Sequence, residues 1–216
     1  MKLTVTTFQT LDGVMQAPGG PEEDRAGGFE HGGWVFPHVD EEFGAFMDET
    51  FRSAEAFLLG RFTYETFAAH WPKVDDAGDP VAAKLNALPK HVASRTLRQE
   101  DLTWQGSTLL GADVPAAVAE LKARPGGELQ VHGSAGLLQT LLRHDLVDEL
   151  RLLTFPLVLG TGKRLFADGA VPAALRLTES RTTGAGVTIG VYAFAGRPSY
   201  GSFALEDEAE VPAAAQ

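Results

Sequence analysis

Small, hydroxyl-bearing and basic residues follow three short apolar runs in this 216-residue chain. They are Gly60, Arg61 and Thr63 after the first run, Ser94, Arg95 and Thr96 after the second, and Gly133, Ser134, Ala135 and Gly136 after the third. The carboxyl ends of parallel strands meet at one edge of a sheet, where helix starts add partial positive charge. The three segments therefore predict one anion site, of the kind that holds a phosphorylated cofactor.

The residue types at this predicted site favour a dinucleotide that carries an extra phosphate. Arginine binds phosphate through a planar fork of donors, and hydroxyl and main-chain N–H groups complete the shell. An unphosphorylated ribose would instead favour an acidic partner. The Gly-x-Gly-x-x-Gly fingerprint does not follow the first predicted strand, and Arg164 stands where a phosphate loop needs Ser or Thr. A doubly wound dinucleotide domain and a nucleoside triphosphatase are both disfavoured.

Two carboxylates and two aromatic residues are candidates for the chemistry beside the cofactor. Asp12 lies in the turn after the first predicted strand and Asp48 lies on the first predicted helix, so both are candidate catalytic residues. Trp34 and Phe36 lie in a Gly- and Pro-rich loop at residues 16–39, which predicts a lid that contacts the substrate. The alternatives are that Asp12 caps its own turn, Asp48 faces solvent and Trp34 merely packs on the domain.

Composition excludes several classes of protein. The chain has no cysteine and its six histidines lack metal-ligand spacing, so we expect no disulfide, thiolate or metal site, and we expect the histidines to be surface or structural. The sequence contains no Gly-x-Ser-x-Gly elbow of a serine hydrolase. A net charge of −11 argues against nucleic-acid or membrane-surface binding. Because neither a long apolar segment nor a signal peptide is present, we expect a cytoplasmic protein.

Apolar periodicity predicts one domain of alternating strands and helices over residues 1–196. Predicted strands cover residues 3–8, 56–59, 91–94, 107–110, 128–131, 149–156, 175–183 and 187–194. Predicted helices cover residues 40–53, 63–71, 81–88, 114–123 and 135–143. This order predicts an α/β fold whose mainly parallel central sheet ends in a C-terminal antiparallel hairpin. Residues 197–216 are expected to form an acidic, mobile tail.

Five segments occur in the order seen in the dihydrofolate reductase superfamily, at residues 10–13, 58–64, 93–96, 131–135 and 156–166. The chain most resembles the reductase domain of bifunctional riboflavin-biosynthesis deaminase/reductases and its stand-alone relatives. The resemblance implies a dihydrofolate reductase-like three-layer sandwich, NADPH as cofactor, and a homodimer built on the C-terminal strands. We expect no accompanying zinc deaminase, because the chain has neither the length nor the cysteine ligands for one.

Carried over by position, the resemblance assigns roles to the three segments. Residues 60–63 would meet the adenosine side or the pyrophosphate, residues 94–96 the 2′-phosphate, and residues 133–136 the pyrophosphate. Asp48 or Glu49 stands where the family places a proton-donating carboxylate on the first helix. We therefore expect an NADPH-dependent reductase that transfers hydride to a C=N or C=O group of a small molecule, with pteridine- and pyrimidine-like rings among the candidate substrates. The alternative is a non-catalytic nucleotide-binding or sensor protein with the same fold.

Overall fold

The structure is a computed structural model that describes residues 1–74, 77–166 and 168–202. Its strands are β1 (Lys2–Thr10), β2 (Ala54–Gly60), β3 (Lys90–Ala93), β4 (Ser107–Leu109), β5 (Glu128–His132), β6 (Glu149–Phe155), β7 (Leu175–Thr182) and β8 (Thr188–Phe194). Its α-helices are α1 (Glu41–Arg52), α2 (Arg61–His70), α3 (Pro80–Ala87), α4 (Val114–Ala123) and α5 (Ala135–Arg143). Short 3-10 helices are η1 (Ala26–Gly28), η2 (Phe36–His38), η3 (Trp71–Lys73) and η4 (Gln99–Asp101). Most of the tail expected from residue 197 lies outside the described residues.

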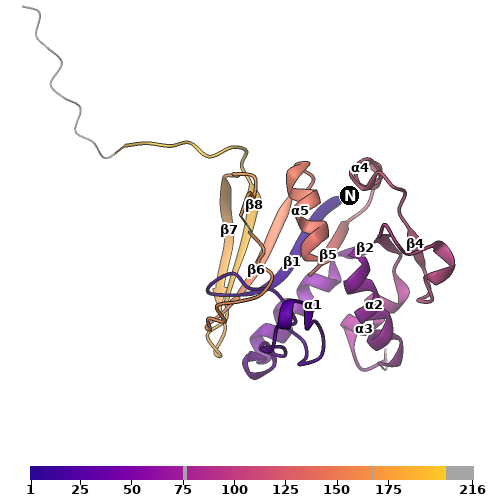
Figure 1. The fold of residues 1–216 in the computed structure, drawn as a ribbon, viewed down its shortest axis with the longest axis horizontal. Helices are drawn as coiled ribbons and strands as arrows, with labels where there is room; N and C mark the ends of the chain where they lie inside the picture. The colour runs from indigo at the N-terminus through magenta and orange to yellow at the C-terminus, as the bar shows by residue number, and fades with distance from the viewer. Residues whose placement is uncertain (75–76, 167, 203–216) are drawn as a thin grey trace, which may run out of the picture.

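All of these strands join one sheet, in the order β4-β3-β2-β5-β1-β6-β8-β7 (Figure 1). Every pairing from β4 to β6 is parallel, whereas β8 runs antiparallel to both β6 and β7. The predicted parallel sheet with a C-terminal antiparallel hairpin is confirmed. The second strand of the hairpin, β8, lies against β6, so β7 forms the edge.

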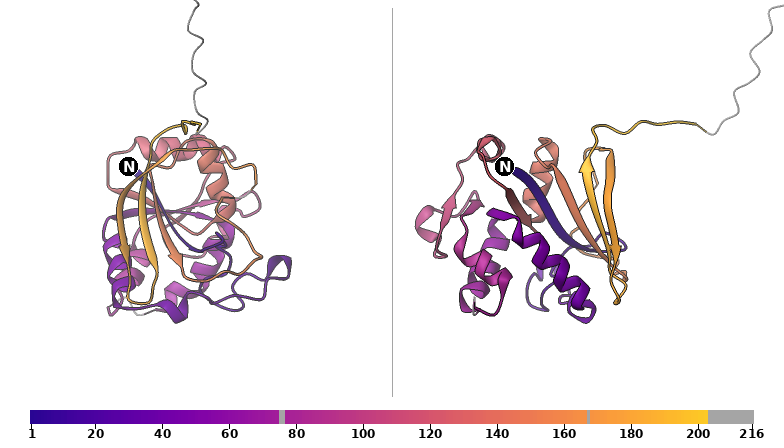
Figure 2. Two further views of the ribbon diagram at one scale, coloured as in Figure 1. Left: turned by 90° about the vertical axis from the view of Figure 1, so that its left-hand side faces the viewer. Right: turned by 180° about the vertical axis from the view of Figure 1, so that it is seen from behind.

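Helices cover both faces of the sheet. Leu138 of α5 and Val118 of α4 pack with the side chains that β1 and β5 direct to one face. Phe46 of α1 and Leu85 of α3 pack in two aromatic-rich clusters on the opposite face. Figures 1 and 2 show α5 and α1 on opposite sides of the sheet. No helix among the described residues is long and apolar enough to cross a bilayer.

A buried row of polar side chains separates the two aromatic-rich clusters beneath α1. Glu128, Gln130 and His132 alternate along β5 and therefore share its α1-facing side. The guanidinium of Arg151 on β6 donates to both carboxylate oxygens of Glu128, at 2.6 and 2.9 Å, and at 2.9 Å to Glu149. Because its members bond to one another, this row can remain buried at little cost. It leads up to the carboxyl edge of the parallel strands.

Candidate functional site

A cleft of about 1350 Å³ opens at the carboxyl edge of β1, β2, β3 and β5. Typical small-molecule pockets measure roughly 300–1,000 Å³, so this cleft has room for a dinucleotide and a second small molecule. Its walls come from α1, from the starts of α2 and α5, from the loop after β1, and from the loop after β3. The three segments predicted from the sequence thus converge on one cavity.

Hydrogen bonds join the first and third segments directly. The Gly60 N–H donates to Ser134 Oγ at 2.9 Å, and Ser134 Oγ donates to Thr63 Oγ1 at 3.0 Å. A Cβ added to Gly60 would lie 3.3 Å from Ser134 Oγ, so glycine permits this close approach of the two strand ends. Thr63 is buried by these contacts, while Arg61 on the same helical turn is exposed and lines the cleft.

The two helices that start at the cleft differ from the others at their N-termini. Helices α1, α3 and α4 each begin at an aspartate whose carboxylate accepts hydrogen bonds from first-turn N–H groups. Helices α2 and α5 begin at Gly60 and Ser134 without a side-chain cap. Their first N–H groups therefore lack a side-chain acceptor and can bind an anion. The turn before α5 is tight, with positive φ at both Gly133 (59°) and Ser134 (61°).

The second segment contributes Ser94 and Arg95 to the cleft, but Thr96 does not line it. Ser94 Oγ accepts from the main-chain N–H groups of Thr96 and Leu97, at 3.1 and 3.0 Å, and so fixes the turn after β3. Arg95 is exposed at this turn. Of the ten residues predicted to bind the cofactor, nine line the cleft: Gly60, Arg61, Thr63, Ser94, Arg95, Gly133, Ser134, Ala135 and Gly136.

The two candidate catalytic carboxylates lie in different surroundings. Asp48 of α1 is exposed and lines the cleft. Asp12 does not line it; its carboxylate accepts from the N–H groups of Leu159 and Gly160, at 3.2 and 2.8 Å, and pairs with Arg164. The hydrogen bond from the Thr10 hydroxyl, with these main-chain bonds, lowers the pKa of Asp12 to about 2 although its burial opposes the shift. In this geometry Asp12 holds two loops together, outside the cleft.

The loop at residues 16–39 lines the cleft through residues other than its two predicted aromatic contacts. Trp34 is buried, its Nε1–H donates to Gln16 O at 2.8 Å, and its ring packs edge-on against Phe155 at 5.2 Å. Phe36 is 81% exposed, and neither ring lines the cleft. Val35 and Glu23 from the same loop do line it. The loop borders the predicted substrate side, whereas its tryptophan packs in the core.

Two cleft residues were not singled out in the sequence. Burial raises the pKa of Glu23, with Asp24 adding to the shift, while the N–H groups of Gly19 and Gly20 oppose it. His132, expected to be surface or structural, is buried at the end of β5 and lines the cleft floor. Polar residues at alternate positions along β5 were a usable signal, because an ordinary central strand is apolar on both faces. The described residues contain no group of three His, Asp or Glu side chains that could hold a metal ion.

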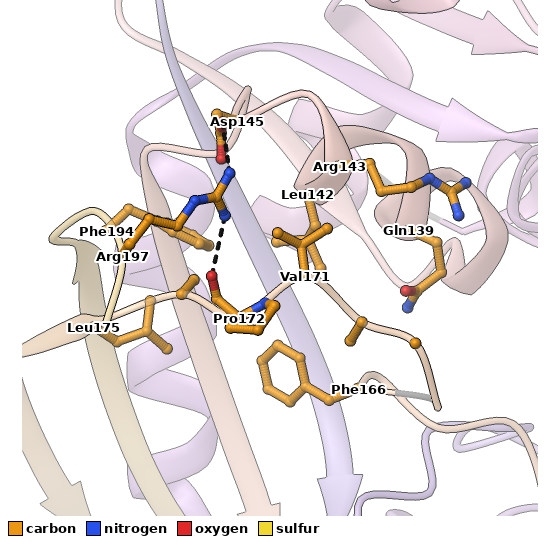
Figure 3. Close-up of a pocket in the computed structure, with 13 residues that line it drawn as sticks. Gln139, Leu142, Arg143, Asp145, Phe166, Val171, Pro172, Leu175, Phe194 and Arg197 are labelled. Carbon is orange, nitrogen blue, oxygen red and sulfur yellow. Dashed lines mark hydrogen bonds and ion pairs between the residues drawn. The ribbon is translucent and has the colours of Figure 1, made fainter. Parts of the chain in front are cut away.

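A second pocket, of about 320 Å³, lies between the end of α5, the loop before β7, and β8 (Figure 3). Leu142, Phe166 and Phe194 form apolar walls. At its rim Arg197 donates to Pro172 O at 3.0 Å and lies 3.5 Å from the Asp145 carboxylate. The three strand ends do not line this pocket, so the larger cleft is the candidate functional site.

Comparisons with known proteins agree with this geometry. The family model that describes the RibD C-terminal domain matches residues 1–189 of this chain. The uncharacterized protein YyaP of Bacillus subtilis is 29% identical over 188 residues, which is 85% of this chain and 89% of YyaP. The structure of a protein assigned to riboflavin biosynthesis from Shewanella sp. PV-4 has a TM-score of 0.66 at 22% identity, covering 90% of this chain and 99% of that one.

The dihydrofolate reductase of Enterococcus faecalis, solved with NADP(H) bound, has a TM-score of 0.57 at 12% identity, covering 89% of this chain and 96% of that one. At such identities the two solved structures establish the fold alone. The dihydrofolate reductase-like architecture expected from the five sequence segments is therefore confirmed.

Proposed function

The chain belongs to the RibD C-terminal domain family, and from that premise we propose that it is an NADPH-dependent reductase of a small heterocyclic or carbonyl compound. The observation that carries the proposal is the convergence of two uncapped helix starts and two arginines on one cleft with room for a second molecule. Bound NADPH would supply a hydride, which the substrate accepts at the carbon of a C=N or C=O group.

The residues of the cleft fit the phosphates of this cofactor. The uncapped N-termini of α2 and α5 present main-chain N–H groups, and a Cβ at Gly136 would meet open space. We assign the pyrophosphate to residues 133–136 and to the start of α2. Arg95 and Arg61 would hold the 2′-phosphate side, with Ser94 and Thr96 shaping the turn after β3.

A proton must also reach the reduced substrate. Asp48 is the candidate donor, directly or through an ordered water, because it projects from α1 into the cleft near the apolar side chains of Met47 and Phe51. Asp12 would act only by fixing the loops that border the cleft. Asp48→Asn should therefore lower kcat much more than it changes the affinity for NADPH.

Calorimetric titration with NADPH and NADH tests the cofactor assignment. The unmodified protein should prefer NADPH, and Arg95→Ala should weaken NADPH binding by about 10- to 100-fold, since a charge-assisted hydrogen bond contributes about 1.5–3 kcal/mol. Arg98→Ala is the matched control, because Arg98 is exposed on the same loop but does not line the cleft. Equal affinity for the two cofactors in the unmodified protein would overturn the assignment.

Catalysis is tested separately with a panel of pteridines, pyrimidines and carbonyl compounds, followed by the loss of reduced-nicotinamide absorbance. Oxidation of NADPH in the presence of any compound of the panel would support the proposal that the protein is a reductase. Tight NADPH binding without oxidation by any member would favour the second candidate, a sensor or nucleotide-binding protein. The panel therefore separates the two functions without a substrate being known beforehand.

We also propose a homodimer, although the apolar runs expected to form its surface are largely used within the chain. Leu153 and Val187 are fully buried, and Ile189 is 1% exposed. The available surface is the β7 edge with Leu177, which is 51% exposed. Light scattering at micromolar concentration tests the proposal, and a monomeric mass would contradict it.

A further inference from the structure

His132 sits where the buried polar row reaches the cleft, and its neighbours fix its tautomer. Gln130 Nε2 donates to Thr50 O at 2.6 Å and to Glu128 Oε2 at 2.8 Å, which sets the orientation of the amide. Gln130 Oε1 consequently faces His132 Nε2, at 3.1 Å. An amide oxygen can only accept, so Nε2 carries the imidazole proton. In the neutral ring Nδ1 is then an acceptor.

The ring is held rigidly but keeps Nδ1 available. The Phe51 ring stacks on the imidazole with centroids 4.5 Å apart and planes inclined by 11°. His132 makes no hydrogen bond through Nδ1 within the described residues, and Nδ1 is not one of the buried polar atoms there that lack a partner. Since His132 is 7% exposed and lines the cleft, the free acceptor lies on the part of the ring open to the cleft.

The electrostatic environment of His132 excludes a role as proton donor to the substrate. Burial, reinforced by the nearby Arg151 charge, lowers the pKa of His132 to about 3, and the opposing effect of Glu128 is smaller. The imidazole is therefore neutral near pH 7 and has no proton to release except the one committed to Gln130. The imidazole can still accept a hydrogen bond from a ligand through Nδ1.

The polar floor of the cleft contains one more unsatisfied group. Thr6 of β1 is the register partner of His132 on β5, so the two side chains lie beside each other. Thr6 Oγ1 is buried without a hydrogen-bond partner, while the walls above come from Phe43, Met47 and Phe51. Flat apolar walls over a polar floor suit a planar ring that carries polar groups on one edge.

We infer that His132 is a specificity-determining residue of the proposed reductase, accepting through Nδ1 a hydrogen bond from an N–H group on the edge of a planar heterocyclic substrate. This inference rests on the proposed function. It selects, among C=N and C=O compounds, those that carry a ring N–H or amino donor. A site with a fixed acceptor rejects analogues that lack the donor, because the acceptor is then buried unpaired.

Two substitutions separate the ring's nitrogens. His132→Asn places an amide oxygen near the position of Nδ1 but loses the bond to Gln130, whereas His132→Gln can donate to Gln130 but lacks an acceptor at Nδ1. The probe is 2,4-diaminopyrimidine, titrated by calorimetry into each variant saturated with NADPH. His132→Gln should weaken probe binding about ten-fold, the loss expected for one neutral hydrogen bond. His132→Asn should weaken it less than three-fold.

Each outcome bears on the inference in a defined way. Both variants should bind NADPH as the unmodified protein does, and thermal melts report whether they fold. The inference would be overturned if probe binding is weakened equally in both variants or is unchanged in His132→Gln. It would also be overturned if the probe does not bind the NADPH-loaded unmodified protein. Failure of NADPH itself to bind the unmodified protein would instead overturn the proposed function, so the two failures are distinguishable.

Discussion

Replacing Arg151 by methionine should destabilise the protein by about 3–5 kcal/mol at neutral pH, the range for breaking a buried ion pair on one side. The guanidinium bonds both oxygens of Glu128 and one oxygen of Glu149, and the three side chains are only 11–12% exposed. In the Arg151→Met variant Glu149 still pairs with the Lys2 ammonium, at 2.6 Å, so the unpaired buried carboxylate is mainly that of Glu128.

The pH dependence of this loss has a definite sign. Burial raises the pKa of Glu128, but bonds from Arg151 and Gln130 outweigh it, so the pKa lies below its ordinary value. In the unmodified protein this carboxylate therefore stabilises the fold above its unfolded pKa, and the contribution is lost in acid. Without Arg151 burial dominates, the pKa rises, and stability instead falls as pH increases through about 4.5 and above.

Urea unfolding followed by tryptophan fluorescence, at about pH 8 and about pH 4.5, measures both effects. The gap between the unmodified protein and Arg151→Met should be widest at the higher pH and should narrow in acid. Arg25→Met is the matched control, because Arg25 and its partner Glu22 are largely exposed, and it should cost less than about 1 kcal/mol. A loss below about 1 kcal/mol for Arg151→Met, or a constant gap, would refute the reasoning.

Three further substitutions test other parts of the structure. Burial lowers the pKa of Lys90 to about 8. Above that pH the unfolded chain binds more protons than the folded protein, so the free energy of unfolding should rise from about pH 8 to about pH 10. Urea unfolding of Lys90→Met should lack this rise. Gly162→Ala would place a Cβ 2.7 Å from Val14 Cγ1 at a φ of +122°, so calorimetry should show about 1–3 kcal/mol of destabilisation, whereas Gly20→Ala, with no atom within 4 Å, should be nearly neutral. Trp34→Ala should lower the free energy of unfolding by about 3–5 kcal/mol in urea titrations, because the indole is buried; unchanged stability would contradict its placement in the core.

Much of the fold could be predicted because its signals are local. Alternating apolar runs, glycines and prolines marked each of the eight strands found in the described part of the chain, and the predicted bounds of α4 and α5 match the structure. Convergence of residues 60, 95 and 134 followed from one rule, that parallel strands end together. The helix predicted over residues 40–53 begins at Asp40, and in the structure the Asp40 carboxylate caps α1 by accepting from the Phe43 N–H at 2.8 Å.

What could not be predicted depends on contacts between distant residues. Asp12 follows the first strand, which ends at Thr10, yet its partners at residues 159, 160 and 164 lie about 150 positions away, and these partners make it a brace between two loops. The packing of Trp34 depends on Phe155, again a long-range neighbour. His132 was undervalued because its environment comes from β1, β5, β6 and α1 together, and no single segment shows it.

The loop after β1 and the loop after β6 are fastened to each other. Met15 N–H donates to Lys163 O at 2.8 Å, the Lys163 ammonium pairs with Asp24 at 2.5 Å, and Val14 bridges to Arg164. A chimera that takes only the first loop from a relative would therefore lose the matching partners of these hydrogen bonds and of this ion pair. Exchanging the two loops together would preserve these contacts. The two loops therefore behave as one structural unit, although some 150 residues separate them in the chain.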